Sequence, residues 1–274
     1  NWLGDVAMCT PALRALARRF PDRALIAAGR RSACELVKGL PWLRSAVPIP
    51  AQPGIAAMLA LRKALRGPGA MLAVVFPHSF RAALAAWVSG AEVRLGYVRD
   101  GRSWLLTHNV LPYREDGAIV PVYMGREYLD LVKTIGCEDD GEGLELAAEP
   151  EAVEQIRARL EGEGPLVAVA PGAAFGPSKR WPPERYAAVI DQLHDEAGAR
   201  LVLVTGPGEE DTRDAVLSAA RYPVIVADGG HPTIDTLKAT LALADLLIGN
   251  DSGPRHVAIA FKKPVICIMG PTSP

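Results

Sequence analysis

The sequence contains few cysteines, and their spacing excludes the structural roles that cysteine usually has. The four of them are far apart, without a Cys-x-x-Cys pair or the Cys/His spacing of a zinc site: Cys9, Cys34, Cys137 and Cys267. The five histidines show no metal-ligand spacing either. We therefore expect neither a disulfide framework nor a structural zinc site, and a reducing compartment agrees with this cysteine usage.

Long hydrophobic runs are also missing. The mean hydropathy is slightly positive, +0.13, and comes largely from alanine. No uninterrupted apolar run reaches the roughly 18 residues that a membrane-spanning helix needs. Hydrophobic residues make up 49% of the 274 residues and charged residues 22%, which is ordinary globular composition and excludes a disordered chain.

The whole chain has almost no excess of positive or negative charge, but each half has a large excess of one sign. The formal net charge is -1, so nucleic acid is not an expected partner. Residues 1–135 carry 18 Lys and Arg against 9 Asp and Glu, a net +9, and the remainder carries a net −10. A basic N-terminal half would attract an anionic ligand or an anionic membrane surface, although scattered arginines on solvated helices would give the same count.

Alternating apolar segments predict strands and helices along the first half. The pair Thr10-Pro11 predicts an N-cap and a helix over 11–20. Further helices are expected over 55–65, 81–88 and 123–135, with strands over 23–28, near Ile49, over 70–76 and over 92–97. Residues 99–121 show no clear period, and we expect a long irregular segment there.

The alternation continues after an acidic stretch, where we place a domain boundary that gives domains 1–145 and 146–274. Strands are expected over 166–170, 200–205, 224–226, 246–249 and 265–269, with helices over 151–160, 183–196, 209–220, 234–243 and 254–261. The pattern predicts two open α/β domains with parallel sheets, whose ligands bind beyond the carboxyl ends of the strands. Both ends of the chain have loop-like sequence, so we expect its first strand and C-terminal helices to be missing.

Two loops at these carboxyl ends have features of a phosphate site. In residues 249–256, Ser252 or Gly253 would cap a helix whose free N–H groups bind an anion. In residues 171–182, a rigid loop carries the adjacent cations Lys179 and Arg180, which suit a diphosphate. The alternatives are a well-capped helix without a ligand and a solvated Lys-Arg pair beside a packed Trp181.

A third loop carries acidic residues at the start of a helix. Glu209 and Glu210 lie where a carboxylate favours the helix dipole, and this alone explains their position. In a binding role, one of them would accept hydrogen bonds from a ribose. The third glycine of a G-x-G-x-x-G fingerprint is missing, so a dinucleotide site is not supported.

Asp5 is a candidate general base. If the helix begins at Thr10-Pro11, Asp5 lies in a loop at the ligand end of the sheet, where a carboxylate can take a proton from a substrate. An Asx turn is the structural alternative. The sequence has no DxD motif to hold Mg²⁺, no P-loop and no G-x-S-x-G nucleophile motif.

Taken together, these segments resemble the bacterial heptosyltransferases, the ADP-heptose:lipopolysaccharide transferases of glycosyltransferase family 9. The matching segments follow the family's order over nearly the whole chain: Leu3-Gly4-Asp5, residues 10–16, Pro171-Gly172, Lys179-Arg180-Trp181-Pro182, Asn250-Asp251-Ser252-Gly253, His256 and residues 270–274. Pro254-Arg255 departs from the pattern, because many relatives have Leu or Pro followed by Met there.

The resemblance implies a GT-B architecture, in which two Rossmann-like domains face a cleft, and an inverting transfer without a metal or other cofactor. Asp5 would be the base, and Lys179 with the N–H groups at Ser252–Gly253 would stabilise the departing diphosphate in place of Mg²⁺. The catalytic pair implied is therefore Asp5 and Lys179. The donor-binding residues implied are Ser178, Lys179, Arg180, Glu209, Glu210, Asp251, Ser252, Gly253 and His256.

The resemblance also implies a partner for the basic half of the chain. The donor would be ADP-heptose and the acceptor an anionic glycolipid, the lipopolysaccharide inner core, with Thr10 on the acceptor side. Either Arg62, Lys63 and Arg66 of one predicted helix or Arg30-Arg31 beyond a strand would bind its anionic groups. A cytoplasmic protein in peripheral contact with the inner membrane is expected. The rival interpretations are a GT-B enzyme for a different nucleotide sugar, an epimerase included, and a non-catalytic relative that binds a nucleotide sugar or a glycan.

Overall fold

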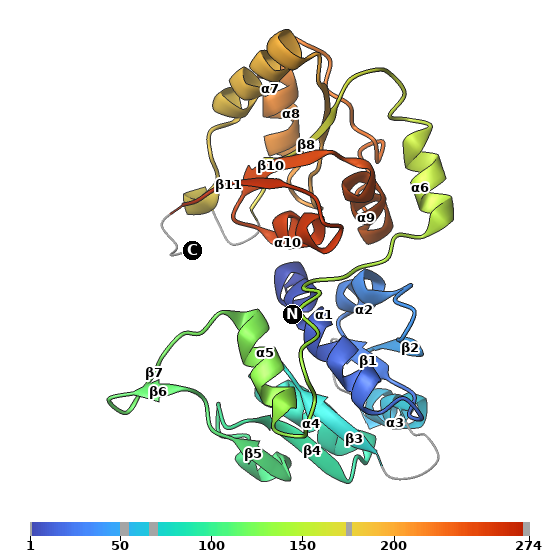
Figure 1. Cartoon of the computed structure of the whole chain (residues 1–274), viewed down its shortest axis with the longest axis vertical. Coiled ribbons are helices and arrows are strands. Elements are labelled where there is room, and N and C mark those ends of the chain that lie inside the picture. Colours follow the sequence, from blue (N-terminus) through green and yellow to red (C-terminus); the bar gives the residue numbers. More distant parts are fainter. Residues whose placement is uncertain (1, 50–54, 66–70, 174–176, 271–274) are drawn as a thin grey trace. The chain divides into compact units, whose positions relative to one another are not determined.

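The computed structural model describes residues 2–49, 55–65, 71–173 and 177–270. The chain divides into two compact units, one formed by residues 8–143 and the other by residues 2–7 with residues 144–274 (Figure 1). The few residues at the start of the chain thus group with the second unit, although the expected boundary assigned them to the first. Each unit is an α/β structure built on parallel strands.

The first helix, α1 (Leu3–Arg19), begins well before the expected start, and Pro11 lies inside it. The prediction of an N-cap at Thr10 is therefore wrong. Apolar residues are buried along α1 on both sides of the proline: Ala7, Met8, Cys9, Ala12, Leu13 and Leu16. Packing of this face outweighs the cost of about 3 kcal/mol for an interior proline. Asp5 consequently lies in the first turn of a helix rather than in a loop.

The first unit contains two small parallel sheets. One pairs β1 (Ile26–Gly29) with β2 (Ser45–Pro48), and the other has the order β3-β4-β5. The remaining elements are β3 (Leu72–Val75), β4 (Val93–Tyr97), β5 (His108–Val110), α2 (Arg31–Val37), α3 (Ile55–Leu65), α4 (Phe80–Ser89) and α5 (Met124–Lys133).

The segment 99–121 is more regular than expected. It contains the short helix η1 (Ser103–Leu105), the strand β5, and a hairpin of β6 (Arg114–Glu115) with β7 (Ala118–Ile119). The polar, exposed residues of β5 carry no hydrophobic alternation, because the strand lies at the edge of its sheet. The prediction of an irregular segment is therefore wrong for these residues.

The second unit is built on one parallel sheet with the order β11-β10-β8-β9. Its elements are α6 (Pro150–Arg157), β8 (Leu166–Ala170), η2 (Pro177–Lys179), α7 (Pro183–Ala197), β9 (Arg200–Leu203), α8 (Glu210–Ala219), α9 (Ile234–Leu243), β10 (Leu246–Asn250), α10 (Gly253–Ala260) and β11 (Val265–Ile268). The strand expected at 224–226 reduces to one isolated bridge between Ile225 and Val202. Helices cover both faces of the sheet, α7 and α8 on one side and α9 and α10 on the other (Figure 1).

The strand order of the second unit creates a switch point. From β8 the chain passes through α7 to β9 on one side, whereas β10 lies on the other side of β8. The loops that leave β8 and β10 therefore diverge at the carboxyl edge, where open α/β sheets bind their ligands.

Candidate functional site

The loops on either side of the switch point are joined by a buried asparagine. The Asn250 Oδ1 accepts hydrogen bonds from the Tyr186 hydroxyl at 2.8 Å and from the Trp181 N–H at 3.3 Å. Its Nδ2 donates to the Pro171 carbonyl at 2.6 Å. Only 1% of Asn250 is exposed, so these bonds satisfy the side chain completely inside the protein and hold the loop after β8 against the end of β10.

An ion pair spans the same crevice. The Lys179 Nζ lies 2.8 Å from Asp251 Oδ2, and both side chains are largely buried, at 14% and 13% exposed. The chain leaves β11 through Gly270, where a Cβ would come within 3.2 Å of the Ser178 carbonyl. Three loops thus meet around Lys179, one each from the ends of β8, β10 and β11.

A second cation, Arg255, shares the same carboxylate. Its Nη2 lies 3.0 Å from Asp251 Oδ1, one helical turn away, and its Nε donates to His256 Nε2 at 3.2 Å. Asp251 therefore bridges Lys179 and Arg255, and the three side chains together carry a net charge of +1. The sequence offered Arg255, a departure from the family pattern, as an added phosphate contact or a sign of a different donor, but its pairing with Asp251 was not predicted, because that depends on the direction of the side chain.

The start of α10 carries buried polar atoms that have no hydrogen-bond partner among the described residues. These are the Oγ of Ser252, which is the N-cap residue but makes no side-chain cap, and the Nδ1 of His256. Burial, helped by the positive charge of Arg255, lowers the pKa of His256 to about 4. The ring is therefore neutral near pH 7, and since Nε2 accepts from Arg255, Nδ1 carries the proton and is a free donor.

The acidic residues after β9 lie against the loop after β8. The Glu209 Oε2 accepts from the Gly206 N–H at 2.7 Å, and a Cβ built on Gly172 would collide with its carboxylate. The Glu210 Oε1 accepts from the Gly208 N–H at 3.1 Å, and backbone N–H groups lower the pKa of Glu210. Glu209 thus touches the candidate site, while Glu210 caps its own turn.

Asp5 belongs to the second unit and lies beside α10. A Cβ on Gly4 would come within 2.8 Å of His256 Cδ2, and one on Gly253 within 3.1 Å of Leu3 Cβ. The first turn of α1 therefore packs on the start of α10. Asp5 directly follows Gly4, the residue that contacts His256. Its side chain is partly exposed.

The other predicted residues are less closely grouped. Ser178 and Arg180 are exposed, and Arg180 reaches back to the Ala173 carbonyl at 3.4 Å. Thr10 is completely buried in α1, which gives no support to direct contact with an acceptor. Arg62 and Lys63 are exposed in the last turn of α3. Arg66 lies outside the described residues.

A charged cluster that sequence reasoning missed lies at the carboxyl edge of the first unit. Glu127 of α5 is buried, with its Oε1 2.8 Å from His78 Nε2 and 3.5 Å from Arg99 Nη2. His78 follows β3 and Arg99 follows β4. The rule that open α/β sheets bind ligands beyond the carboxyl ends of their strands, which we applied to the second half of the chain, could therefore have found them.

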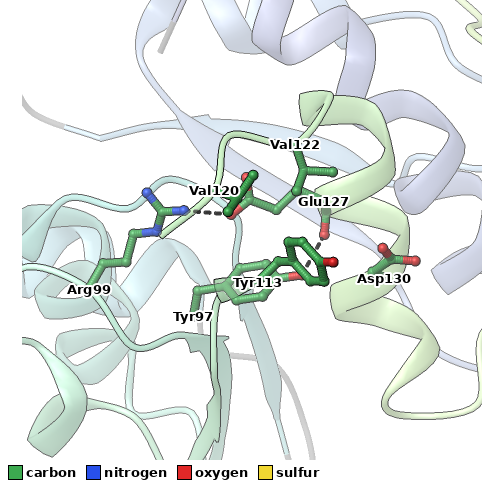
Figure 2. Close-up of a pocket in the computed structure, with 7 residues that line it drawn as sticks. All are labelled: Tyr97, Arg99, Tyr113, Val120, Val122, Glu127 and Asp130. Carbon is green, nitrogen blue, oxygen red and sulfur yellow. Dashed lines mark hydrogen bonds and ion pairs between the residues drawn. The ribbon is translucent and has the colours of Figure 1, made fainter. Parts of the chain in front are cut away.

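Figure 2 shows Arg99 and Glu127 in a small pocket with Tyr97, whose hydroxyl donates to the Glu127 carbonyl at 2.9 Å. Burial and the charge of Glu127 raise the pKa of Tyr97 to about 12. The cavity measures about 30 Å³, which suits a water molecule rather than a sugar. This pocket is therefore too small to be a sugar site as it stands.

The described residues contain neither a metal-ligand cluster nor a helix that could span a membrane. They contain no group of three or more His, Cys, Asp or Glu side chains that could hold a metal ion. None of their helices combines the length and the hydropathy that crossing a bilayer requires.

Comparison with known proteins gives consistent matches. The model of glycosyltransferase family 9 (heptosyltransferase) matches residues 58–274. Lipopolysaccharide heptosyltransferase 2 of Escherichia coli K12 is 28% identical over 287 residues, covering 100% of this chain and 82% of that protein. The solved structure of the E. coli ADP-heptose lipopolysaccharide heptosyltransferase II superposes with a TM-score of 0.82 at 25% identity, covering 100% of this chain and 84% of that one. A family 9 glycosyltransferase structure from Veillonella parvula has a TM-score of 0.86 at 23% identity, covering 100% and 79%.

Proposed function

The chain belongs to glycosyltransferase family 9, the heptosyltransferases, and we propose that it moves a heptose from ADP-heptose to the inner core of a lipopolysaccharide. Its fold is of the GT-B class and it is a glycosyltransferase, as its relatives are. The finer proposal covers the sugar, the acceptor, inversion at the anomeric carbon and the absence of a metal requirement.

The observation that carries the proposal is the paired cation site at the start of α10. Lys179 and Arg255 flank Asp251, and the unpartnered Ser252 Oγ and His256 Nδ1 lie at the same helix terminus. Backbone N–H groups at a helix start add a positive potential. A diphosphate that leaves a sugar gains negative charge in the transition state, and this set of groups stabilises that charge without rearranging.

The displacement that we propose takes one step at the sugar. The Asp5 carboxylate takes the proton of an acceptor hydroxyl, and the oxygen attacks the anomeric carbon from the face opposite to the nucleotide. The bond from that carbon to the diphosphate oxygen breaks, and its electron pair stays with ADP. A single displacement inverts the anomeric configuration.

The nucleotide end of the donor has candidate partners in the second unit. We assign the ribose hydroxyls to Glu209, whose carboxylate lies against the loop after β8, with Glu210 beside it. Ser178, Arg180 and Gly253 border the same loops. Since Lys179 and Arg255 supply positive charge at the leaving group, the proposal includes transfer in the absence of a divalent metal ion.

The acceptor in this proposal is an anionic glycolipid, held by the basic first unit. Residues 1–135 carry a net +9, which favours carboxylates and phosphates on the acceptor. A lipid-linked acceptor also brings the enzyme into peripheral contact with the inner membrane from the cytoplasmic side.

Ligand-dependent thermal unfolding followed by a transfer assay tests the proposal. ADP and ADP-heptose are expected to raise the unfolding temperature, with EDTA making no difference, and ADP-heptose is expected to support transfer to a lipopolysaccharide core that lacks heptose. Stabilisation by UDP or GDP alone would overturn the donor. Loss of transfer with EDTA, restored by a divalent metal, would overturn metal independence.

A further inference from the structure

Helix α4 turns an apolar stripe outward. Its inward face packs Ala83 and Ala86 into the core of the first unit. Phe80 and Trp87, seven residues apart and so close in angle around the helix, are 40% and 53% exposed, whereas Leu84 between them is partly buried and packs against the core. Surface helices usually place polar residues on the face that meets water, so this stripe needs an explanation.

The stripe continues onto neighbouring elements at both of its ends. The Trp104 ring is 67% exposed and its centroid lies 6.0 Å from that of Phe80. At the other end, the Arg62 guanidinium lies beside Gly90, the C-cap of α4, and α3 packs along α4. We call this surface the α3–α4 face, formed by Leu59, Arg62, Lys63, Phe80, Arg81, Trp87 and Trp104.

All charges in this part of the chain are positive. No Asp or Glu occurs between Glu35 and Glu92, whereas this stretch contains the basic residues Lys38, Arg44, Arg62, Lys63, Arg66 and Arg81. Arg62 and Lys63 are exposed on α3, and Arg81 is exposed on α4, the helix that carries Phe80 and Trp87. A surface that binds another protein through apolar contacts has no need of such one-sided charge, whereas an anionic bilayer attracts it.

The chemistry of these side chains fits the interfacial layer of a membrane. Tryptophan places an apolar ring and a hydrogen-bonding N–H at the boundary between acyl chains and headgroups, and Arg and Lys reach anionic headgroups from the same depth. We propose that the α3–α4 face docks the protein on an anionic phospholipid bilayer. The inference does not depend on the sugar transferred, and it joins the proposed function only because a lipid-linked acceptor lies in that bilayer.

Vesicle binding by the purified protein, without donor or acceptor, tests the proposal. Flotation is measured with phosphatidylcholine vesicles that do or do not contain phosphatidylglycerol. We expect binding only to the anionic vesicles, and each charge removed in the triple variant R62S/K63S/R81S to weaken it about fivefold. The matched control removes three exposed cations of the second unit, R157S/R185S/K262S, and is expected to bind nearly as well as the unchanged protein. Equal loss in both triple variants, or no binding by the unchanged protein, would overturn the proposal.

The aromatic part is tested by W87S and F80S, with W2S as the matched control because Trp2 is 57% exposed in the second unit. We expect weaker binding, about tenfold for W87S, and loss of quenching by brominated lipids, at an unchanged unfolding temperature. If these variants instead abolish a dimer and leave vesicle binding intact, the face is a contact between copies and the proposal fails. Vesicle binding without heptose transfer would overturn the proposed function alone.

Discussion

The two units carry positive charge in opposite ways. In the second unit, the cations Lys179 and Arg255 are largely buried and share one carboxylate. In the first unit, Arg62, Lys63 and Arg81 are exposed on helices of a sequence stretch, residues 36–91, that contains no Asp or Glu. Buried, paired charges hold a fixed geometry for a small anionic ligand, whereas exposed charges match a broad anionic surface of variable geometry.

The largest effect is expected from Asp5→Asn in the second unit, which should lower the rate of transfer but leave ligand binding almost unchanged. The amide keeps the size of the side chain but cannot accept the proton, so we expect kcat to fall about 10²–10⁴-fold. The affinity for ADP, measured by calorimetry, should stay within about twofold, because ADP binding at the proposed diphosphate site involves no proton transfer to Asp5.

The control for this variant is Asp22→Asn, an exposed carboxylate of the first unit. It should retain the full rate. A rate for Asp5→Asn within about threefold of the unchanged protein would remove Asp5 from the mechanism.

Lys179→Ala tests whether the buried cations act on the leaving group. Loss of one preorganised donor at a developing negative charge is worth about 10²–10³ in kcat, and we expect a loss of that size. ADP should also bind more weakly, because its phosphates lose a charge partner. Steady-state kinetics and calorimetry on Arg157→Ala, an exposed cation on α6, supply the comparison. Equal small effects in both variants would mean that burial of Lys179 serves stability rather than catalysis.

His256 makes the stability of the second unit sensitive to acid. Burial lowers its pKa from 6.5 to about 4, so below about pH 6.5 the unfolded chain binds a proton that the folded protein excludes. Stability is therefore full above about pH 6.5 and falls as the pH drops toward 4, by about 2 kcal/mol between about pH 7 and pH 5. Denaturant unfolding of the protein and of His256→Gln at both pH values measures it. An equal pH dependence in the two proteins would contradict the assignment.

Much of the second unit could be predicted because burial leaves a strong pattern in its sequence. The bounds of β8 and α9 agree with the expected 166–170 and 234–243, since β8 is buried throughout and Thr233 caps α9. The carboxyl-end rule brought Lys179, Asp251 and His256 to one edge of the sheet. The pairing of Arg255 with Asp251 and the role of Asn250 in joining loops were not predicted, because they depend on side-chain directions that no residue pattern contains.

The first unit was harder to predict for physical reasons of two kinds. Pro11 is a strong local signal for a helix start, and only the burial of apolar residues before it, such as Ala7 and Met8, shows that packing prevails. The edge strand β5 has no apolar alternation. Thr10, taken for a cap and an acceptor contact, belongs to the buried face of the same helix.

The smallest effects are expected when exposed cations of the first unit are replaced, and they concern its free energy of unfolding. Arg62 lies at the C-terminal end of α4, where a positive charge interacts favourably with the helix dipole, so Arg62→Ala should cost about 0.3–1 kcal/mol of unfolding free energy. Lys63 is exposed in the last turn of α3, and Lys63→Ala should change stability by less than about 0.5 kcal/mol. Chemical denaturation measures both. If the two variants lost as much stability as a buried ion pair gives, these charges would be structural, and the contrast between buried and exposed cations would disappear. If neither variant loses that much stability, these charges do not serve folding and can bind an anionic surface. Their loss should then raise the KM for the acceptor and leave the KM for the donor unchanged.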